Sequence, residues 1–348
     1  MVQLRVVAPH EQAQAALELL KSNPAACHVV YLEGVAHAPD GDLIMADVAR
    51  EEASVIVGDL KELGIHRTGA ISIEPIEVQL SHRADMAERD APGAPADAVV
   101  WEQVEGRTSE ETRLSGTFLI FIVLAALIAS VGIYLDSPIL VVGAMVVGPE
   151  FGPIAALCVA LVELRGRLAL RSFAALALGF PLAITAVWIT SLIFRATGVT
   201  PETFTEQNHS LATSISSPDV FAFFVAFCAG VAGMLSLSTA KSGALVGVLI
   251  SVTTIPAAAN VGVAFTYEDW EAWRGSLGQL AINVTAIVLA GTLTLWVQRL
   301  LYRQRRFKHL RNRERARAGL PVGRSANATS RGTSTPRASS APGGSPRR

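Results

Sequence analysis

The sequence carries little charge. Asp, Glu, Lys and Arg make up 17% of its 348 residues, whereas a soluble domain usually carries about 25%. This deficit argues against an ordinary soluble enzyme. Because 51% of the residues are hydrophobic and the mean hydropathy is +0.40, the composition also argues against disorder as the dominant state. We therefore expect a membrane protein.

The chain also lacks the residue patterns of common catalytic and metal sites. Its three cysteines, Cys27, Cys158 and Cys228, form no CxxC pair, so we predict neither a disulfide framework nor a zinc site. No GxSxG, HExxH, P-loop or dinucleotide-binding glycine pattern occurs, and none of the seven histidines falls within an apolar span. We therefore expect no enzymatic activity, no cofactor and no metal.

Basic residues are concentrated at the C-terminal end. From Arg299 onward there are 14 Lys and Arg and one acidic residue, which leaves 15 basic and 29 acidic residues before it. Residues 303–348 are rich in Arg, Ser, Pro, Gly and Thr, so we predict a disordered basic cytoplasmic tail. Basic residues beside a membrane are attracted to anionic lipid by about 1 kcal/mol each, and nucleic-acid binding is the less favoured alternative. The residues expected to contact lipid are Arg303, Arg305, Arg306 and Lys308.

The first 80 residues alternate between strand-like and helix-like patterns. A Pro39-Asp40-Gly41 turn separates two short apolar runs, and Gly64 closes an amphipathic helix. The resulting order, βαββαβ, predicts an α+β ferredoxin-like soluble domain over residues 1–80. Residues 81–112 are acidic and contain Ala91-Pro92-Gly93-Ala94-Pro95, so we predict a polar linker there. The expected elements are a strand at 2–7, a helix at 11–21, strands at 29–36 and 41–48, a helix at 51–63 and a strand at 71–73.

Residues 113–302 are predicted as an α-helical membrane domain. Its apolar segments are long enough to cross a hydrocarbon core of about 30 Å as helices. With six spans, the basic residues Arg165, Arg167, Arg171 and Lys241 all fall on the cytoplasmic side, in agreement with the positive-inside rule. We therefore expect a multi-pass protein of the bacterial inner (plasma) membrane with both termini in the cytoplasm. The expected spans are 116–135, 138–162, 168–194, 220–237, 243–265 and 277–297.

Two of these spans contain residues that break helices. The second includes Gly143-Ala144-Met145-Val146 followed by Pro149 and Pro153, and the fifth begins Gly243-Ala244-Leu245-Val246 and continues to Pro256. Proline removes an amide donor and clashes with the preceding turn. The two spans are the middle members of successive three-span groups, which suggests a 3+3 inverted repeat with a midplane site, as in secondary transporters. The alternative is that the glycines only form a packing seam between helices.

Glu150 is the most informative polar residue in these spans. A carboxylate at the centre of a span costs at least about 2.5–3.5 kcal/mol on insertion scales, so such residues usually face a bundle interior or a wet cavity. It either titrates a proton, binds a cation, or is a structural carboxylate held by the backbone amides at the start of the second half-helix. The residues expected at the solute or ion site are Glu150, Pro149, Gly152, Pro153, Thr253, Thr254, Pro256, Asn260 and Asn283.

The motif residues resemble a known family. Gly143-Ala144-Met145-Val146-Val147-Gly148-Pro149 with Gly152-Pro153-Ile154, and Ser242-Gly243-Ala244-Leu245-Val246-Gly247-Val248 with Pro256, resemble the bacterial domain of unknown function 389 family over residues 115–300. The resemblance implies a multi-span inner-membrane protein, often with an N-terminal soluble domain, and implies no substrate. An apolar residue often stands at the position of Glu150 in that family, so the resemblance carries over only the glycines and prolines, as architecture.

Two functions compete on these observations. The first is a transporter or channel for a small solute or ion, with the broken second and fifth spans forming a midplane site. The second is a membrane-anchored sensor or scaffold whose N-terminal domain binds a small ligand or a partner. The expected partners are the lipid bilayer, anionic head groups at the basic tail and a second copy of the chain, with no nucleic acid.

Overall fold

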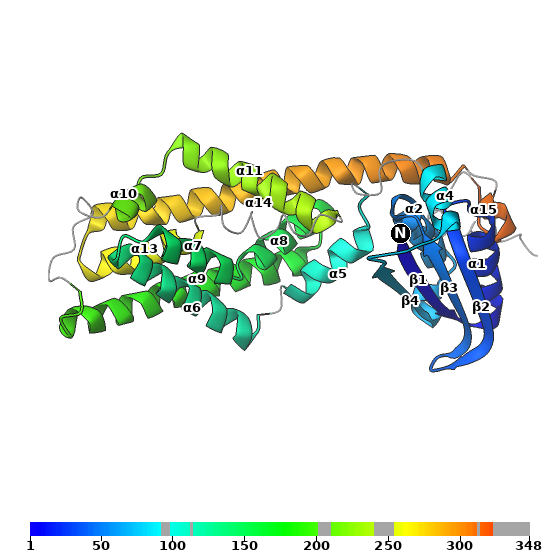
Figure 1. The fold of residues 1–348 in the computed structure, drawn as a ribbon, viewed down its shortest axis with the longest axis horizontal. Coiled ribbons are helices and arrows are strands. Elements are labelled where there is room, and N and C mark those ends of the chain that lie inside the picture. The colour runs from blue at the N-terminus through cyan, green and yellow to red at the C-terminus, as the bar shows by residue number, and fades with distance from the viewer. Residues whose placement is uncertain (92–97, 112–113, 201–209, 240–253, 312–313, 323–348) are drawn as a thin grey trace, which may run out of the picture. The chain divides into compact units, whose positions relative to one another are not determined.

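The computed structural model describes residues 1–91, 98–111, 114–200, 210–239, 254–311 and 314–322. The chain divides into two compact units. One comprises Met1–Pro92 together with Arg303–Arg348, and the other comprises Gly93–Tyr302. Each unit is described by itself below, with the element labels of Figure 1.

The first unit contains a four-stranded sheet with the predicted βαββαβ order, with the short helix α3 inserted before β4 and the helix α4 after it. All strand pairs are antiparallel and the strands are arranged β2-β3-β1-β4. Val2, Leu4 and Val6 are buried and alternate with more exposed neighbours along β1. Since alternate residues of a strand point to the same face, one face of the sheet is buried. The elements are β1 (Val2–Ala8), α1 (His10–Ser22), β2 (Ala26–His37), β3 (Asp40–Val48), α2 (Arg50–Glu62), α3 (Ile65–Thr68), β4 (Ala70–Pro75) and α4 (His82–Asp90).

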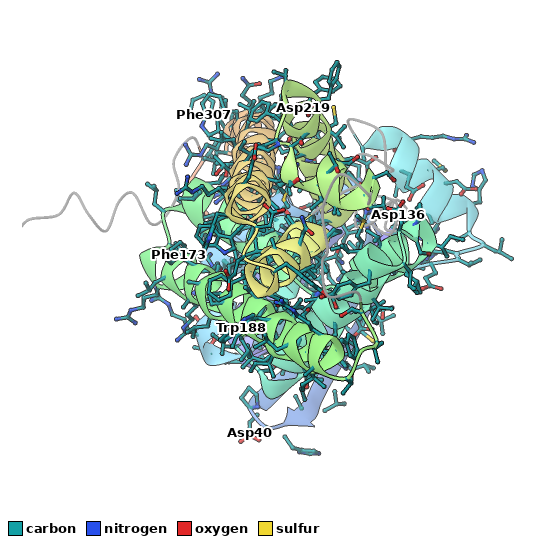
Figure 2. All side chains as sticks on the ribbon, turned by 90° about the vertical axis from the view of Figure 1, so that its left-hand side faces the viewer. Asp40, Asp136, Phe173, Trp188, Asp219 and Phe307 are labelled. Atoms are coloured by element: carbon teal, nitrogen blue, oxygen red, sulfur yellow. The ribbon has the colours of Figure 1, made fainter. Side chains whose placement is uncertain are left out.

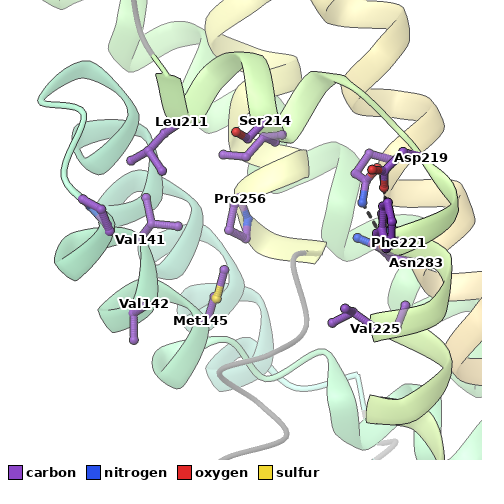
Figure 3. Close-up of a pocket in the computed structure, with 15 residues that line it drawn as sticks. Val141, Val142, Met145, Leu211, Ser214, Asp219, Phe221, Val225, Pro256 and Asn283 are labelled. Atoms are coloured by element: carbon purple, nitrogen blue, oxygen red, sulfur yellow. Dashed lines mark hydrogen bonds between the residues drawn. The ribbon is translucent and has the colours of Figure 1, made fainter.

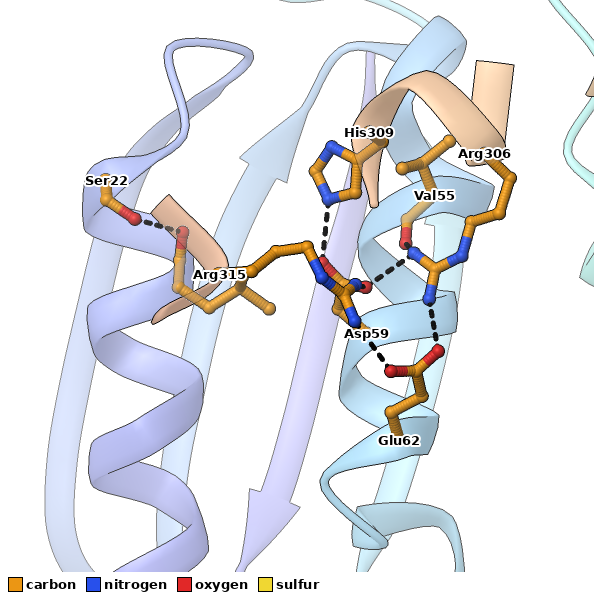
Figure 4. Close-up of polar contacts among 8 residues, drawn as sticks. Ser22, Val55, Asp59, Glu62, Arg306, His309 and Arg315 are labelled. Carbon is orange, nitrogen blue, oxygen red and sulfur yellow. Dashed lines mark hydrogen bonds and ion pairs between the residues drawn. The ribbon is translucent and has the colours of Figure 1, made fainter. Parts of the chain in front are cut away.

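The C-terminal basic segment is part of this unit. Helix α14 (Trp270–His309) continues well past the expected start of the tail, and a short helix α15 (Glu314–Arg317) follows. Arg306 forms ion pairs with Asp59 and Glu62 on α2, and its guanidinium also donates to the Val55 carbonyl at 2.7 Å (Figure 4). Residues 303–309 and 314–317 are therefore helical where the sequence predicted disorder, and Arg306 pairs with protein carboxylates.

The second unit is a bundle of apolar helices (Figure 1). Local signals set several helix starts: Ser115 accepts a hydrogen bond from the Phe118 amide at 3.1 Å, and Asp219 accepts one from the Ala222 amide at 2.7 Å. The helices are α5 (Trp101–Glu111), α6 (Gly116–Tyr134), α7 (Pro138–Val147), α8 (Phe151–Glu163), α9 (Gly166–Ala196), α10 (Ser210–Ser216), α11 (Val220–Ser238), α13 (Thr254–Thr266) and the N-terminal part of α14.

The expected linker over residues 81–112 contains two helices, α4 and α5. The many charged residues of α5 make its apolar side hard to recognise in the sequence. Trp101 and Val104, three positions apart on that side, are both buried in a core that also contains residues of α8. Spacing of this kind places two side chains on one helix face. The helix is therefore held by packing against the membrane helices.

Four helices of the described chain, α6, α9, α11 and α14, are long and apolar enough to cross a membrane, and the bent pair α7–α8 makes a fifth if it is one span. Four of the expected spans thus have helices whose bounds lie close to the expected bounds or extend beyond them. The fifth expected span, 243–265, is described only from Thr254, as the shorter apolar helix α13. Six spans are therefore not established by the described residues.

Exposed side chains on these helices are largely apolar. Phe173, labelled in Figure 2, lies on the outside of α9 and is 61% exposed. Other exposed apolar residues on the same helix include Leu170 and Ile193. A surface of this composition suits lipid and not water.

Polar contacts tie the two ends of the bundle. At one end, Glu163 pairs with Arg165 at 2.8 Å and with Arg299 at 3.3 Å. At the other, Arg195 donates to the Thr266 carbonyl at 3.0 Å. The loop after α8 and the last turns of the membrane part of α14 therefore lie at the same end of this unit.

Candidate functional site

The second expected span is broken where its prolines predict. Helix α7 ends at Val147, α8 begins at Phe151, and the two helices are bent by 52°. Pro149 has no amide hydrogen to continue the helix, and Gly148 has an extended backbone with φ −63° and ψ 129°. Pro153 lies in the first turn of α8, where its missing amide donor would have no partner in any case. The prediction of a broken helix is confirmed here.

Glu150 lies at this break and contacts the fifth expected span. Its side chain is at the N-terminus of α8, with the residue only 3% exposed, and its Oε1 accepts a hydrogen bond from Thr254 Oγ1 at 2.7 Å. Thr254 is fully buried at the first residue of α13. The hydrogen bond therefore joins two segments that are 104 positions apart in the sequence.

The other carboxylate oxygen of Glu150 has no hydrogen-bond partner among the described residues. It lies against Gly148, where a Cβ atom would overlap Glu150 Oε2 and would come within 2.8 Å of Ile255 Cγ1. The close approach of the three residues thus requires glycine at position 148. Gly143 differs, because among the described residues nothing lies within 4 Å of the Cβ that it lacks.

The same unit has a cavity of about 420 Å³, whose lining includes Met145 of α7 and Pro256 of α13 but neither Glu150 nor Thr254 (Figure 3). Pro256, two residues after Thr254, forms part of its wall, and Asn283 of α14 forms another part. The lining is mainly apolar, as in most small-molecule sites. Its polar side chains come from Ser214, Asp219, Gln279 and Asn283.

The two buried asparagines make different contacts. Asn260, on α13, is 1% exposed and donates to Ser276 Oγ on α14 at 2.8 Å, so it joins two helices. Asn283 accepts a hydrogen bond from Gln279 Nε2, one turn earlier on the same helix, at 3.1 Å. Gln279 Oε1 is buried without a partner among the described residues. The cavity therefore has an unsatisfied acceptor in its wall.

The structure places the predicted site residues in different surroundings. Glu150 and Thr254 are in contact, Pro256 and Asn283 line the cavity, and Asn260 is a buried helix-to-helix contact. Pro149, Gly152 and Pro153 form the break and the first turn of α8. Thr253 lies outside the described residues. Of the residues expected to contact lipid, Arg303, Arg305 and Lys308 are exposed.

Sequence reasoning missed most of the cavity wall. Gln279 had a usable signal, because a polar residue one turn before Asn283 places two amides on one face of an apolar helix. Ser214 and Leu211 come from α10, a seven-residue helix that no sequence pattern predicted. Asp219 is recognisable as the N-cap of α11, but not as part of a cavity.

Comparison with known proteins agrees with the family resemblance. Residues 145–289 match the model of a family described as Domain of unknown function (DUF389). An uncharacterised protein of Methanocaldococcus jannaschii is 26% identical over 206 residues, which cover 56% of this chain and 59% of that relative. No solved structure gives a significant match. The Glu150–Thr254 contact, Pro256 and Asn283 all lie within the matched segment, and the resemblance of this chain to the DUF389 family is confirmed for residues 145–289.

Proposed function

We propose that this membrane protein is a transporter or channel that moves a small cation or proton, alone or coupled to a small solute. The broken second span and the start of α13 hold the site, and Glu150 is the residue that exchanges the ion. The observation that carries this proposal is the buried hydrogen bond between Glu150 and Thr254, on a helix whose Pro256, two residues after Thr254, lines the cavity. Buried ionisable residues in membrane segments usually belong to ion pathways or proton relays.

The proposed topology has six spans and an inverted repeat of two three-span halves. Two contacts support a crossing second span. Asp136, just before α7, accepts a hydrogen bond from the Leu211 amide at 2.9 Å, whereas Glu163 at the end of α8 pairs with Arg299 near the end of the membrane part of α14. We assign the end with Arg165 and Arg299 to the cytoplasm, because basic residues gather there. The N-terminal unit, with its antiparallel β2-β3-β1-β4 order, is proposed to be ferredoxin-like.

The site explains why backbone can be unwound within the membrane. Backbone N–H and C=O groups that lose their helical hydrogen bonds at a break are tolerated within the membrane only where protein or a water-filled cavity borders them. The Gly148-Pro149-Glu150 break meets this requirement through α13, and the cavity behind Pro256 supplies space for a small ligand. Asp219, Gln279 and Asn283 give that cavity acceptors suited to a cation or a hydrogen-bonding solute.

Reconstitution into liposomes tests the proposal. The full chain is placed in vesicles that enclose a pH-sensitive dye, a potassium gradient with valinomycin sets the voltage, and uptake of radioactive sodium is measured in parallel. We expect wild-type vesicles to pass protons or sodium faster than empty vesicles, and Glu150→Gln to abolish that flux because it keeps the shape and removes the charge.

Thr254 supplies the matched pair of variants. Thr254→Ser keeps the hydroxyl that donates to Glu150, so its flux should stay close to that of the wild type, while Thr254→Val should reduce it. Equal flux in the wild type, Glu150→Gln and Thr254→Val would place the pathway elsewhere. Wild-type vesicles that are no more permeable than empty ones to either ion would contradict an ion pathway altogether.

A further inference from the structure

Three potential metal ligands meet on the sheet of the N-terminal unit. Cys27 and His28 lie near the start of β2, and Asp47 on β3 is the direct cross-strand partner of Cys27. The Sγ, imidazole nitrogen and carboxylate oxygen of these residues all lie within 4.8 Å of one another. Sequence spacing alone did not reveal this set, because the register of β2 against β3 brings Asp47 to the other two residues.

The backbone at His28 is shaped to bring its ring to the other two residues. The register of β2 and β3 shifts between Cys27 and Val30, and His28 has a φ of 48°, in the left-handed region that residues other than glycine adopt at some energetic cost. In a regular strand, adjacent side chains point to opposite faces of the sheet. The irregularity is what lets two consecutive residues, Cys27 and His28, both approach Asp47, with their Sγ and Nδ1 atoms 3.7 Å apart.

The surroundings of His28 match those of a metal-binding imidazole. Its Nε2 lies 2.9 Å from Ser81 Oγ, so in the tautomer with the proton on Nε2 the ring can donate to Ser81 and turn an Nδ1 lone pair to a metal ion. Metal-bound histidines almost always donate their other ring N–H in this way. Gln79 lies on the same side: its Nε2 is 2.6 Å from Asp47 Oδ2, and its Oε1 is buried without a partner among the described residues.

The distances decide how well an ion would fit. With Zn–S of about 2.3 Å and Zn–N or Zn–O of about 2.0–2.1 Å in a tetrahedron, sulfur and nitrogen ligands are about 3.6 Å apart and nitrogen and oxygen ligands about 3.4 Å. Cys27 Sγ and His28 Nδ1 are 3.7 Å apart. His28 Nδ1 and Asp47 Oδ2 are 2.8 Å apart, so the ring and the carboxylate must separate by about half an ångström.

We propose that Cys27, His28 and Asp47 form a binding site for a divalent transition metal ion of the Zn²⁺ class. On binding, the Cys27 thiol loses its proton to water and the His28 ring takes the tautomer that carries its proton on Nε2, beside Ser81. The thiolate, His28 Nδ1 and an Asp47 oxygen then each form a bond to the ion. A water or, after rotation of its amide, Gln79 Oε1 takes the fourth position. The ion enters from solvent on the His28 side, where that side chain is 36% exposed while Asp47 is 10% exposed.

A hydrogen bond between His28 and Asp47 explains their distance without any metal. It does not explain why the Cys27 thiol also lies beside His28 or why the backbone at His28 is left-handed. Nor does it explain why the Gln79 oxygen is buried without a partner among the described residues. This proposal is independent of transport, because it concerns only the N-terminal unit. It gives that unit a chemistry suited to sensing a metal ion.

Cobalt titration tests the site. The full chain is purified in detergent, stripped with a chelator and titrated with Co²⁺, whose bond to a thiolate gives a charge-transfer band in the near ultraviolet. We expect one Co²⁺ per chain with this band, and displacement of the Co²⁺ by Zn²⁺. Cys27→Ser should abolish the band, while Cys228→Ser, at the exposed cysteine, is the matched control and should leave it unchanged.

Variants of the other residues separate binding from folding. His28→Asn removes the imidazole but keeps a residue that tolerates positive φ, and Asp47→Asn removes the charge at constant size. Both should abolish the Zn²⁺-induced rise in melting temperature while the metal-free protein still unfolds cooperatively. Ser81→Ala should weaken the affinity by about 10–100-fold, as for other second partners of metal-bound histidines. A missing band in the wild type, or a band and affinity that persist in Cys27→Ser, would overturn the proposal.

Discussion

The ion cluster on α2 gives the sharpest stability prediction. Asp59 is fully buried and pairs with Arg306, with His309 at 2.7 Å and with Arg315, which is also fully buried (Figure 4). Glu62 binds the same two arginines at 2.8 and 2.7 Å. Two carboxylates thus balance two guanidinium groups, and Asp59→Asn leaves one buried positive charge without compensation.

Removing one partner of a buried ion pair costs about 3–5 kcal/mol. We expect Asp59→Asn to fall near the lower end, about 3 kcal/mol, because Glu62 still binds both arginines and Arg306 keeps the Val55 carbonyl. Since about 1.4 kcal/mol is a factor of ten, the opening equilibrium of this segment should rise by about a hundredfold.

Hydrogen exchange with mass spectrometry measures that equilibrium in the full chain. Peptides from α2 and from residues 303–311 should lose protection together in Asp59→Asn. Glu18→Gln makes the same acid-to-amide change at an exposed position on α1 and should alter exchange by less than about 0.5 kcal/mol. If α2 loses protection but residues 303–311 do not, or if neither changes, the basic segment is not held on α2 by this carboxylate.

Three further predictions concern single contacts. Gly148→Ala should destabilise the membrane unit by about 1–3 kcal/mol through overpacking against Glu150 and Ile255, seen as a lower melting temperature in detergent. Gly143→Ala, whose new methyl group meets nothing within 4 Å among the described residues, should leave the melting temperature unchanged. Asn260→Ala should cost about 0.6–1.7 kcal/mol of stability, the range for hydrogen bonds between membrane helices. If Asn260 and Ser276 act as one unit, the loss of stability in Asn260→Ala should be no larger than that in Ser276→Ala. The hydrogen bond from Tyr31 holds the pKa of Asp42 below its usual range. The ionised Asp42 carboxylate therefore stabilises the N-terminal unit above the unfolded pKa of about 3.9, and this stabilisation is lost as the pH falls through the lower folded pKa. Asp42→Asn should flatten this acid-side dependence of hydrogen exchange in residues 1–91, and an unchanged profile would contradict the assignment.

Local chemistry explains what the sequence predicted well. The break at Pro149 follows from proline's missing donor, and the spans follow from uninterrupted apolar length, so α6 and α11 differ from their expected bounds by a single residue. The βαββαβ order followed from short periodic runs and a Pro39-Asp40-Gly41 turn in the same way. Each of these depends on residues within one helix or strand.

Contacts between distant residues explain what it missed. The pair Arg306–Asp59 is separated by 247 positions, and no periodicity in either segment indicates the other. Cys27 and Asp47 meet through strand register, and a shift of one residue would have turned Asp47 to the other face. The sequence could indicate the Glu150–Thr254 contact only through the similarity of the two broken spans, because neither residue by itself specifies its partner.

A comparison of Asp59 with Glu150, both buried, bears on whether Glu150 is structural or functional. Asp59 is surrounded by cationic side chains, and its charge is balanced within the fold, as expected for a group with an architectural role. Glu150 is also buried, yet among the described residues the side chain that bonds it is the neutral hydroxyl of Thr254, and its second oxygen has no partner there. No cationic side chain of the described residues pairs with this carboxylate, so we propose a proton or a cation taken up from solution as its counter-charge. Because that positive charge is exchangeable where an arginine is not, the contrast favours a site that loads and releases an ion over a fixed structural link.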